Sequence, residues 1–163
     1  CQLDNPKLDL RIEDGLEYVK NAPDEQFDII VIDSSDPVGP SEWLFCQAFY
    51  QDAYRCLRQG GILTAQGESP HFNQAAFVDL NRCLRRVFSP DDVWCYLVFI
   101  PTYPTGMWSF NYCAKGGRHP LNDVDEGRSR QIAQDFELQY YNHDIHHAAF
   151  CLPTFIKNMV MAG

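Results

Sequence analysis

The stretch that most constrains the fold of this chain spans residues 28–37, Asp-Ile-Ile-Val-Ile-Asp-Ser-Ser-Asp-Pro. Four consecutive branched apolar residues run directly into carboxylates, hydroxyls and a proline. A continuous apolar run without alternation predicts a strand that is covered on both faces, as in a parallel sheet flanked by helices. In such sheets ligands bind beyond the carboxyl ends of the strands. The polar residues 33–36 are therefore predicted to line a pocket.

Acidic residues follow three successive predicted strands. Asp14 follows residues 8–12, Asp33 and Asp36 follow the run above, and Glu68 follows residues 62–65. Asp and Ser also form turns, which accounts for one of these acids but not for all of them. Carboxylates gathered at one edge of a sheet repel one another unless a positive group lies between them. We therefore expect an amine substrate there.

A divalent metal ion is the alternative ligand, because carboxylates also bind such ions. The loop at residues 101–106 favours an organic cation instead. Tyr103 lies there between two prolines, and Trp108 follows. Aromatic faces attract organic cations. The sequence therefore favours an organic cation over a metal ion at this site.

The composition and the net charge limit the kinds of partner that the protein is expected to bind. The chain has 163 residues, of which 45% are hydrophobic, and this is enough for one domain with a substantial core. A net charge of −9 argues against a nucleic-acid partner and is compatible with a cationic ligand. No apolar run reaches the length of a membrane span, and no signal peptide is recognisable. The prediction is a protein that binds neither nucleic acid nor membrane.

The seven cysteines are scattered along the chain without a Cys-x-x-Cys pair. Their number is odd, and most of them lie in apolar segments. This pattern indicates reduced, buried thiols rather than a disulfide or zinc framework, and it predicts a cytoplasmic location.

Hydrophobic periodicity predicts alternating strands and helices, which is an α/β doubly wound pattern. Ser41 is a plausible N-cap for the second helix, and Gly60-Gly61 a plausible stop for it. The predicted strands are residues 8–12, 27–33, 62–65, 93–100 and 107–114, and the predicted helices are residues 16–21, 41–58, 74–87, 128–140 and 153–160.

His143, His146 and His147 have the spacing of one helix face, and Asp144 lies among them. This spacing is typical of a metal site. The flanking residues are aromatic and apolar, however, and no matching ligand set occurs elsewhere in the chain. The three histidines are therefore interpreted as packing residues.

Four motifs then resemble the spermidine synthase family, in that family's order and approximate spacing, and Asp14-Gly15 also matches. The resemblance covers nearly the whole chain. The motifs are Asp33-Ser34-Ser35-Asp36-Pro37-Val38-Gly39-Pro40, Gln66-Gly67-Glu68, Pro101-Thr102-Tyr103-Pro104-Thr105-Gly106 and Tyr140-Tyr141-Asn142-His143-Asp144-Ile145-His146.

The resemblance implies an α/β, Rossmann-like class I methyltransferase fold. It also implies an aminopropyltransferase that moves the aminopropyl group of decarboxylated S-adenosylmethionine to putrescine, giving spermidine and methylthioadenosine, with no metal. Asp33 would be the general base. Putrescine would contact Asp33, Ser34, Asp36, Tyr103, Gln66 and Glu68, and the adenosyl cosubstrate would contact Asp14, Gly15, Ser35, Pro40 and Leu44.

The chain also departs from the family pattern. The family's N-terminal β-hairpin domain, its Gly-rich nucleotide loop and the acid that grips the ribose are absent, so residues 1–163 correspond to the C-terminal part of the catalytic domain. In the family's topology the two missing strands lie at the centre of the sheet, between the strand at residues 8–12 and the strand at residues 27–33. We therefore expect an incomplete fold that is inactive alone, and a homodimer when intact. Trp108 and Ser109 replace an Ile-Gly-like pair, which predicts a different shape for the substrate loop.

Three alternatives remain open. A putrescine N-methyltransferase resembles spermidine synthase in the same motifs but uses intact S-adenosylmethionine. Another small-molecule methyltransferase fits less well, because paired acids suit a polyamine. A non-catalytic fragment or paralogue that acts only as a dimer partner is favoured by the missing half and disfavoured by the intact Asp33 and Tyr103.

Overall fold

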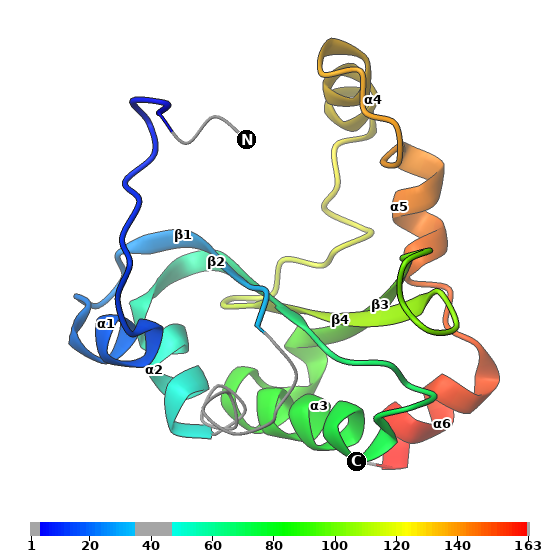
Figure 1. Ribbon diagram of the computed structural model, residues 1–163, viewed down its shortest axis with the longest axis horizontal. Coiled ribbons are helices and arrows are strands. Elements are labelled where there is room, and N and C mark those ends of the chain that lie inside the picture. Colours follow the sequence, from blue (N-terminus) through cyan, green and yellow to red (C-terminus); the bar gives the residue numbers. More distant parts are fainter. Residues whose placement is uncertain (1–3, 35–46, 163) are drawn as a thin grey trace.

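The computed structural model describes residues 4–34 and 47–162 (Figure 1). In that part of the chain the elements follow one another in an α/β order. They are α1 (Gly15–Asn21), β1 (Phe27–Ile32), α2 (Gln47–Cys56), β2 (Leu57–Gln66), α3 (Gln74–Phe88), the 3₁₀ turn η2 (Pro90–Asp92), β3 (Val93–Phe99), β4 (Met107–Ala114), α4 (Glu126–Asp135), α5 (His143–Ala149) and α6 (Thr154–Ala162).

The described strands form one mixed sheet in the order β1-β2-β4-β3. β1 and β2 are parallel, and β4 is antiparallel to both β2 and β3. β3 therefore runs in the same direction as β1 and β2. The residues that directly follow these three strands consequently meet at one edge of the sheet, and the described site residues predicted after them, Asp33, Ser34, Glu68 and Tyr103, lie there.

One face of the sheet carries the main core. α1, α2 and α3 lie together on this face (Figure 1). Inward side chains of the strands, such as Leu63, Ala65 and Cys113, pack there against Leu80 and Leu84 of α3. Each of these five residues is almost completely inaccessible to solvent. The apolar residues that recur at helical spacing in the sequence, such as Leu80 and Leu84, are buried in this core.

The opposite face of β3 and β4 is aromatic. The rings of Tyr96 and Phe110 stack with their centroids 5.4 Å apart, and Phe150, at the end of α5, contacts Tyr96 at 5.3 Å. Thr64 of β2 joins this layer through a 2.9 Å hydrogen bond to the Tyr96 hydroxyl. Burial raises the pKa of Tyr96. α5 therefore covers the β3 end of this second face.

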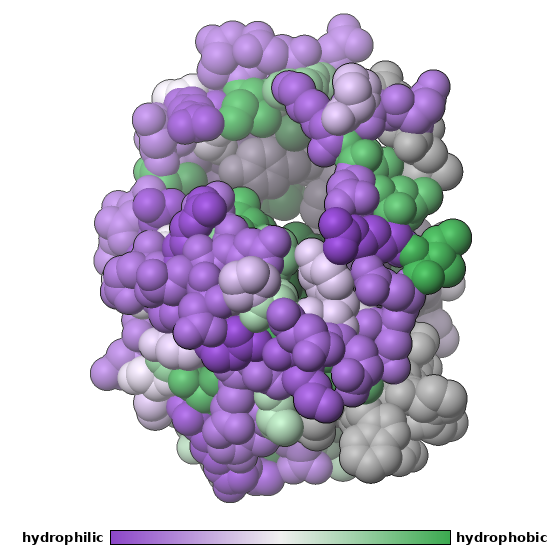
Figure 2. All heavy atoms as spheres, turned by 90° about the vertical axis from the view of Figure 1, so that its left-hand side faces the viewer, coloured by the Kyte–Doolittle hydropathy of each residue, from purple (hydrophilic) through white to green (hydrophobic). Residues whose placement is uncertain are grey.

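The same face of β1 is uncovered in the described part of the chain. Ile29 and Val31 are 62% and 69% exposed. Figure 2 shows the side of the molecule that carries α1 and β1; it is largely hydrophilic, but hydrophobic side chains gather in its upper, hollowed part. The expectation that the residue 27–33 strand is covered on both faces is therefore wrong for the described residues.

The prediction of a strand at residues 8–12 is also wrong. The segment is extended but pairs with no strand of the described residues, and Leu10 and Ile12 are 60% and 98% exposed. Alternating apolar residues favour a strand only where a neighbouring strand can accept the backbone hydrogen bonds. No such neighbour is present in the part of the chain that the structure describes.

The interpretation of Gly60-Gly61 as a helix stop is wrong as well. α2 ends at Cys56, and both glycines lie inside β2. The register between β1 and β2 shifts at this point, and Gly60 adopts φ +78° while its N–H donates to Lys115 O. The glycines therefore form a bulge. The predicted N-cap, Ser41, lies outside the described residues.

The remaining predictions differ mainly in the C-terminal region. The helix at 74–87 and the strand at 107–114 are confirmed, the helix ending one residue later. α4 ends at Asp135 instead of residue 140, and α5 was not predicted. Asn142 caps α5, since its side chain accepts from Ile145 N at 2.8 Å. None of the helices in the described ranges has the length and apolar character needed to cross a bilayer.

Candidate functional site

A cavity of about 390 Å³ lies where β1, β2 and β3 end. Two of the residues that line it follow β1, one ends β2, three come from the loop between β3 and β4, and two belong to β4. They are Asp33, Ser34, Gln66, Ile100, Tyr103, Pro104, Trp108 and Phe110. The structure therefore brings together four predicted putrescine residues, Asp33, Ser34, Gln66 and Tyr103.

The cavity combines a carboxylate with aromatic walls. Asp33 is exposed and has no basic partner among the described residues. The rings of Tyr103 and Trp108 meet edge to face with their centroids 4.7 Å apart. None of the described lining residues is a lysine, arginine or histidine. Such a site attracts an organic cation through the carboxylate and through the ring faces.

Gln66 lines the cavity, and hydrogen bonds hold its side chain in place. Its Nε2 donates to Glu68 Oε1 at 2.8 Å and to Ser34 O at 3.3 Å. Its Oε1 accepts from Glu68 N and from Trp108 Nε1, both at 2.9 Å. Both ends of the amide are therefore engaged by the protein. Gln66 links the end of β1 to the end of β2 and to β4.

Glu68 lies behind Gln66 and does not line the cavity. It is fully buried, and its Oε2 accepts from Asn73 Nδ2 at 2.6 Å. Its backbone adopts φ +69°, an uncommon value for a residue with a side chain. Ser109 fixes this conformation, because its Oγ donates to Glu68 O at 2.8 Å. A direct contact between Glu68 and a substrate stays a prediction.

A second, mostly apolar cavity of about 250 Å³ lies on the other side of the β1 end. Asp33 and Ser34 line both cavities. The other described lining residues come from α1, β1 and α2, and they are Gly15, Tyr18, Val19, Ile30, Val31, Ile32 and Phe49. The structure therefore places Gly15, a predicted cosubstrate residue, beside the predicted base Asp33.

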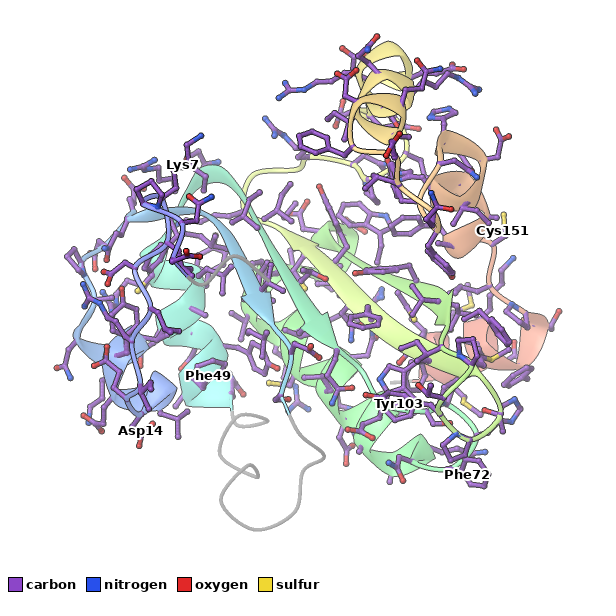
Figure 3. The ribbon with its side chains drawn as sticks, turned by 45° about the horizontal axis from the view of Figure 1, so that its top comes forward. Lys7, Asp14, Phe49, Phe72, Tyr103 and Cys151 are labelled. Atoms are coloured by element: carbon purple, nitrogen blue, oxygen red, sulfur yellow. The ribbon has the colours of Figure 1, made fainter. Side chains whose placement is uncertain are left out.

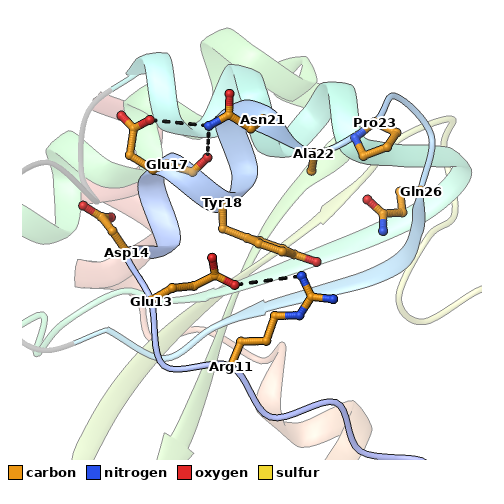
Figure 4. A pocket seen from close by; sticks show the side chains of 9 residues that line it. All are labelled: Arg11, Glu13, Asp14, Glu17, Tyr18, Asn21, Ala22, Pro23 and Gln26. Atoms are coloured by element: carbon orange, nitrogen blue, oxygen red, sulfur yellow. Dashed lines mark hydrogen bonds and ion pairs between the residues drawn. The ribbon is translucent and has the colours of Figure 1, made fainter.

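Asp14 has a structural role in this arrangement. Its side chain caps α1, accepting from Leu16 N at 2.9 Å. It lines a separate, polar cavity of about 370 Å³ together with Arg11, Glu13 and Tyr18 (Figure 4). Figure 3 shows Asp14 beside α1 and Tyr103 on the loop after β3, with the end of β1 between them. The predicted contact of Asp14 with adenine stays a prediction.

Four predicted site residues lie outside the described residues. They are Asp36, a predicted putrescine residue, and Ser35, Pro40 and Leu44, which were predicted to contact the cosubstrate.

The C-terminal histidines are engaged in packing. His146 Nε2 donates to Pro120 O at 2.8 Å, and the ring contacts Phe150. His143 is buried, with its Nε2 3.8 Å from a carboxylate oxygen of Glu126. Within residues 4–34 and 47–162 no three His, Cys, Asp or Glu side chains are grouped in the manner of metal ligands.

Sequence reasoning missed the part that β4 plays. It named Trp108 as an aromatic residue beyond the loop and as a residue that alters the shape of the substrate loop, and it did not name Phe110. Gln66 and Phe110 are paired across β2 and β4, and Trp108 lies two residues before Phe110, on the same face of β4. The alternation of side chains along β4 shows that Trp108 and Phe110 share one face of the strand. It does not show that this face lines the cavity, because that depends on the register between β4 and β2.

Comparisons with known proteins agree with this geometry. The model of the family described as "Spermine/spermidine synthase domain" matches residues 1–126. The polyamine aminopropyltransferase of Clostridioides difficile is 40% identical over 162 residues, which is 98% of this chain and 56% of that protein. The chain therefore spans about half the length of the curated relatives it matches.

Solved structures agree as well. A spermidine synthase in complex with the transition state analogue AdoDATO superposes with a TM-score of 0.90 at 36% identity, over 99% of this chain and 53% of that one. The spermidine synthase of Thermotoga maritima gives a TM-score of 0.88 at 36% identity, over 99% and 52%. These matches confirm the α/β, Rossmann-like fold, and the chain belongs to the spermine/spermidine synthase family.

Proposed function

We propose that the protein containing this chain transfers the aminopropyl group of decarboxylated S-adenosylmethionine to putrescine, giving spermidine and methylthioadenosine without a metal or other resident cofactor. The observation that carries the proposal is the cavity at the end of β1. Asp33 and aromatic rings line it, and none of its described lining residues is basic. Residues 35–46, which continue the chain there, also contain no Lys, Arg or His. This environment suits a diamine.

The proposed chemistry begins with the removal of a proton. An alkyl amine resembles a lysine side chain, whose pKa is about 10.4, so freeing its lone pair at neutral pH costs roughly 4–5 kcal/mol. The Asp33 carboxylate is the group in the cavity that can accept this proton. A serine hydroxyl such as Ser34 is too weak a base for this step.

The transfer itself needs no covalent enzyme intermediate. The amine nitrogen attacks the carbon bound to the sulfonium sulfur, so the N–C bond forms while the C–S bond breaks. The electron pair of that bond leaves with sulfur and neutralises the sulfonium. Asp33 and Ser34 line both cavities, and an amine in one cavity and a nucleoside in the other would meet beside them. Holding the reacting atoms in line supplies much of the rate.

The proposal also covers the size, assembly and location of the protein. Residues 1–163 are the C-terminal part of the catalytic domain, and the match to about half of each relative supports this. The outer edge of β1, along which no strand of the described residues lies, supports it as well. Following the family resemblance, the intact protein is a cytoplasmic homodimer, and this chain alone is inactive. Size-exclusion chromatography with light scattering on the intact protein tests the assembly.

The test compares Asp33→Asn with Asp91→Asn in the intact protein. Asp91 precedes β3 at the opposite end of the sheet and serves as the control. Putrescine is mixed with either decarboxylated or intact S-adenosylmethionine, and products are identified by mass. We expect spermidine from the parent and from Asp91→Asn. For Asp33→Asn we expect a kcat lower by a factor of at least about 100, with putrescine still bound.

Two results would contradict the proposal. N-methylputrescine as the product would identify methyl transfer instead. Normal turnover by Asp33→Asn would remove Asp33 from the role of base.

A further inference from the structure

The loop that carries Tyr103 is fixed at both of its ends by one residue. Phe99 is the last residue of β3 and precedes this loop. Ile100 N donates to Gly106 O at 2.7 Å, and Gly106 N donates to Tyr103 O at 2.9 Å, which close the loop on itself. The Phe99 ring lies against Gly106, so that a Cβ placed on Gly106 would be 2.4 Å from Phe99 Cε2. The position of Phe99 therefore sets the position of the whole loop.

Phe99 is in turn held by a residue far along the chain. Its backbone N–H donates to the hydroxyl oxygen of Tyr140 at 2.9 Å. Tyr140 lies in the connection between α4 and α5. β3 is the edge strand of the described sheet, so Tyr140 contacts it from the side that carries no strand. The C-terminal helical segment thus reaches the acceptor cavity through one hydrogen bond.

The surroundings of this hydrogen bond are loosely packed. An open apolar groove of about 240 Å³ lies beside it, lined by Phe99, Tyr140 and Ile145 among others. Phe99 and Tyr140 are 62% and 52% exposed. β3 is paired with β4 as far as Phe99 and Met107. On the opposite side of β3, where side-chain packing is incomplete, the hydrogen bond to the Tyr140 hydroxyl is the described contact that holds Phe99.

We propose that Tyr140 is a positioning residue for the amine cavity. Its hydroxyl fixes Phe99 and, through Phe99, the loop that supplies Ile100, Tyr103 and Pro104 to the cavity wall. This inference rests on the proposed function for the identity of the ligand. The position of the loop is independent of that function, and it can be measured without any ligand.

The neighbouring tyrosine is a matched control. The Tyr141 hydroxyl hydrogen-bonds Ser129 Oγ at 2.9 Å and lies 3.4 Å from His146 Nδ1. These contacts join α4 to α5 and do not touch the loop. Tyr140→Phe and Tyr141→Phe therefore remove the same atom from adjacent residues, but only the first removes a contact to Phe99.

The first measurement is ligand-free. Amide NMR spectra of the intact protein are compared for the parent and the two variants. We expect Tyr140→Phe to shift the amides of residues 99–106 and the indole N–H of Trp108, whose ring contacts Tyr103. Tyr141→Phe should shift only amides of α4 and α5. Unchanged amides at residues 99–106 in Tyr140→Phe would overturn the inference.

The second measurement is the dissociation constant for putrescine (1,4-diaminobutane), obtained by isothermal titration calorimetry on the same three proteins. The melting temperature of each protein is measured as well. Losing a hydrogen bond of ordinary strength corresponds to about a threefold to tenfold weaker binding. We expect this weakening for Tyr140→Phe and a change of less than about twofold for Tyr141→Phe, although both variants melt at lower temperature. Equal dissociation constants in both variants would overturn the positioning role. An intact parent protein that binds no diamine, with residues 99–106 still shifted in Tyr140→Phe, would instead refute the amine ligand and leave the loop contact confirmed.

Discussion

The substitution Gly106→Ala tests how the acceptor loop is built. Gly106 adopts φ +69°, and an alanine Cβ there would lie 2.4 Å from Phe99 Cε2. The left-handed backbone costs alanine about 1–2 kcal/mol. The Phe99 ring is largely exposed and can turn away, at an off-rotamer cost of about 0.5–1.5 kcal/mol. The expected loss of unfolding free energy is therefore about 1.5–3.5 kcal/mol.

Gly117→Ala is the control for the backbone term. Gly117 adopts φ +77°, but its added Cβ would meet only Asp92 Oδ1, at 3.8 Å. We expect this variant to lose about 1–2 kcal/mol, because it carries the backbone cost without the ring overlap. Urea unfolding followed by far-ultraviolet circular dichroism gives both free energies, and their difference isolates the contact between Gly106 and Phe99.

The comparison also has a local readout. Only Gly106→Ala should shift the indole N–H resonance of Trp108, since only this variant moves the loop that carries Tyr103. Two results would refute the reasoning. One is a Gly106→Ala protein no less stable than Gly117→Ala, and the other is a Trp108 resonance that stays in place.

Three further predictions concern the core, the thiols and the end of α1. Leu84→Ala, at a fully buried position of α3, should cost about 2–5 kcal/mol in urea unfolding; less than about 1 kcal/mol would contradict the described core. Iodoacetamide at pH 8 should label exposed Cys151 well before Cys95, because burial raises the pKa of the Cys95 thiol to about 12; the reverse order by peptide mass would be inconsistent with that burial. Arg55→Gln should lower the urea midpoint, since the Arg55 guanidinium donates to three backbone carbonyls at the end of α1 and to Asp24; an unchanged midpoint would show that these bonds add nothing.

The elements that could be predicted from the sequence are those whose signal is local. The helix at 74–87 was predicted from apolar residues at helical spacing. Phe77, Leu80 and Leu84 are among its five buried residues, whereas Val87, which has the same spacing, is only half-buried. The strand at 107–114 was predicted with both of its bounds. In each case one face of the element packs against the described core, so the spacing of its apolar residues is enough to predict where the element lies in the sequence.

The elements that failed depend on distant partners. Leu8, Leu10 and Ile12 alternate as strand residues do, but a strand forms only against another strand, and none of the described strands lies beside them. Gly60-Gly61 has the composition of a helix stop and of a bulge alike. The neighbouring strands, which are remote in sequence, decide between the two.

The same division applies to the site. The position of Asp33 could be predicted because a carboxylate directly after a strand of a parallel sheet must lie at the sheet edge, whatever the rest of the chain does. Glu68 has the same position after β2, yet its left-handed backbone turns its side chain inward to Asn73. The sequence shows the strand end but not the sign of φ in the residue two positions beyond it.

The register between β4 and β2 is the feature of the site that could not be predicted from the sequence. Gln66 lies opposite Phe110, and this places the Trp108 indole within hydrogen-bonding distance of the Gln66 amide. A shift of one residue would turn Trp108 and Phe110 to the other face of the sheet and would open the floor of the cavity. The wall that faces Asp33 is thus fixed by the pairing of strands some 40 residues apart, for which the motifs after each strand carry no signal. Motifs can therefore identify the acidic side of such a cavity and the aromatic residues near its loop, while the part that β4 plays, with Phe110 and the contact between Trp108 and Gln66, becomes visible only once the sheet is assembled.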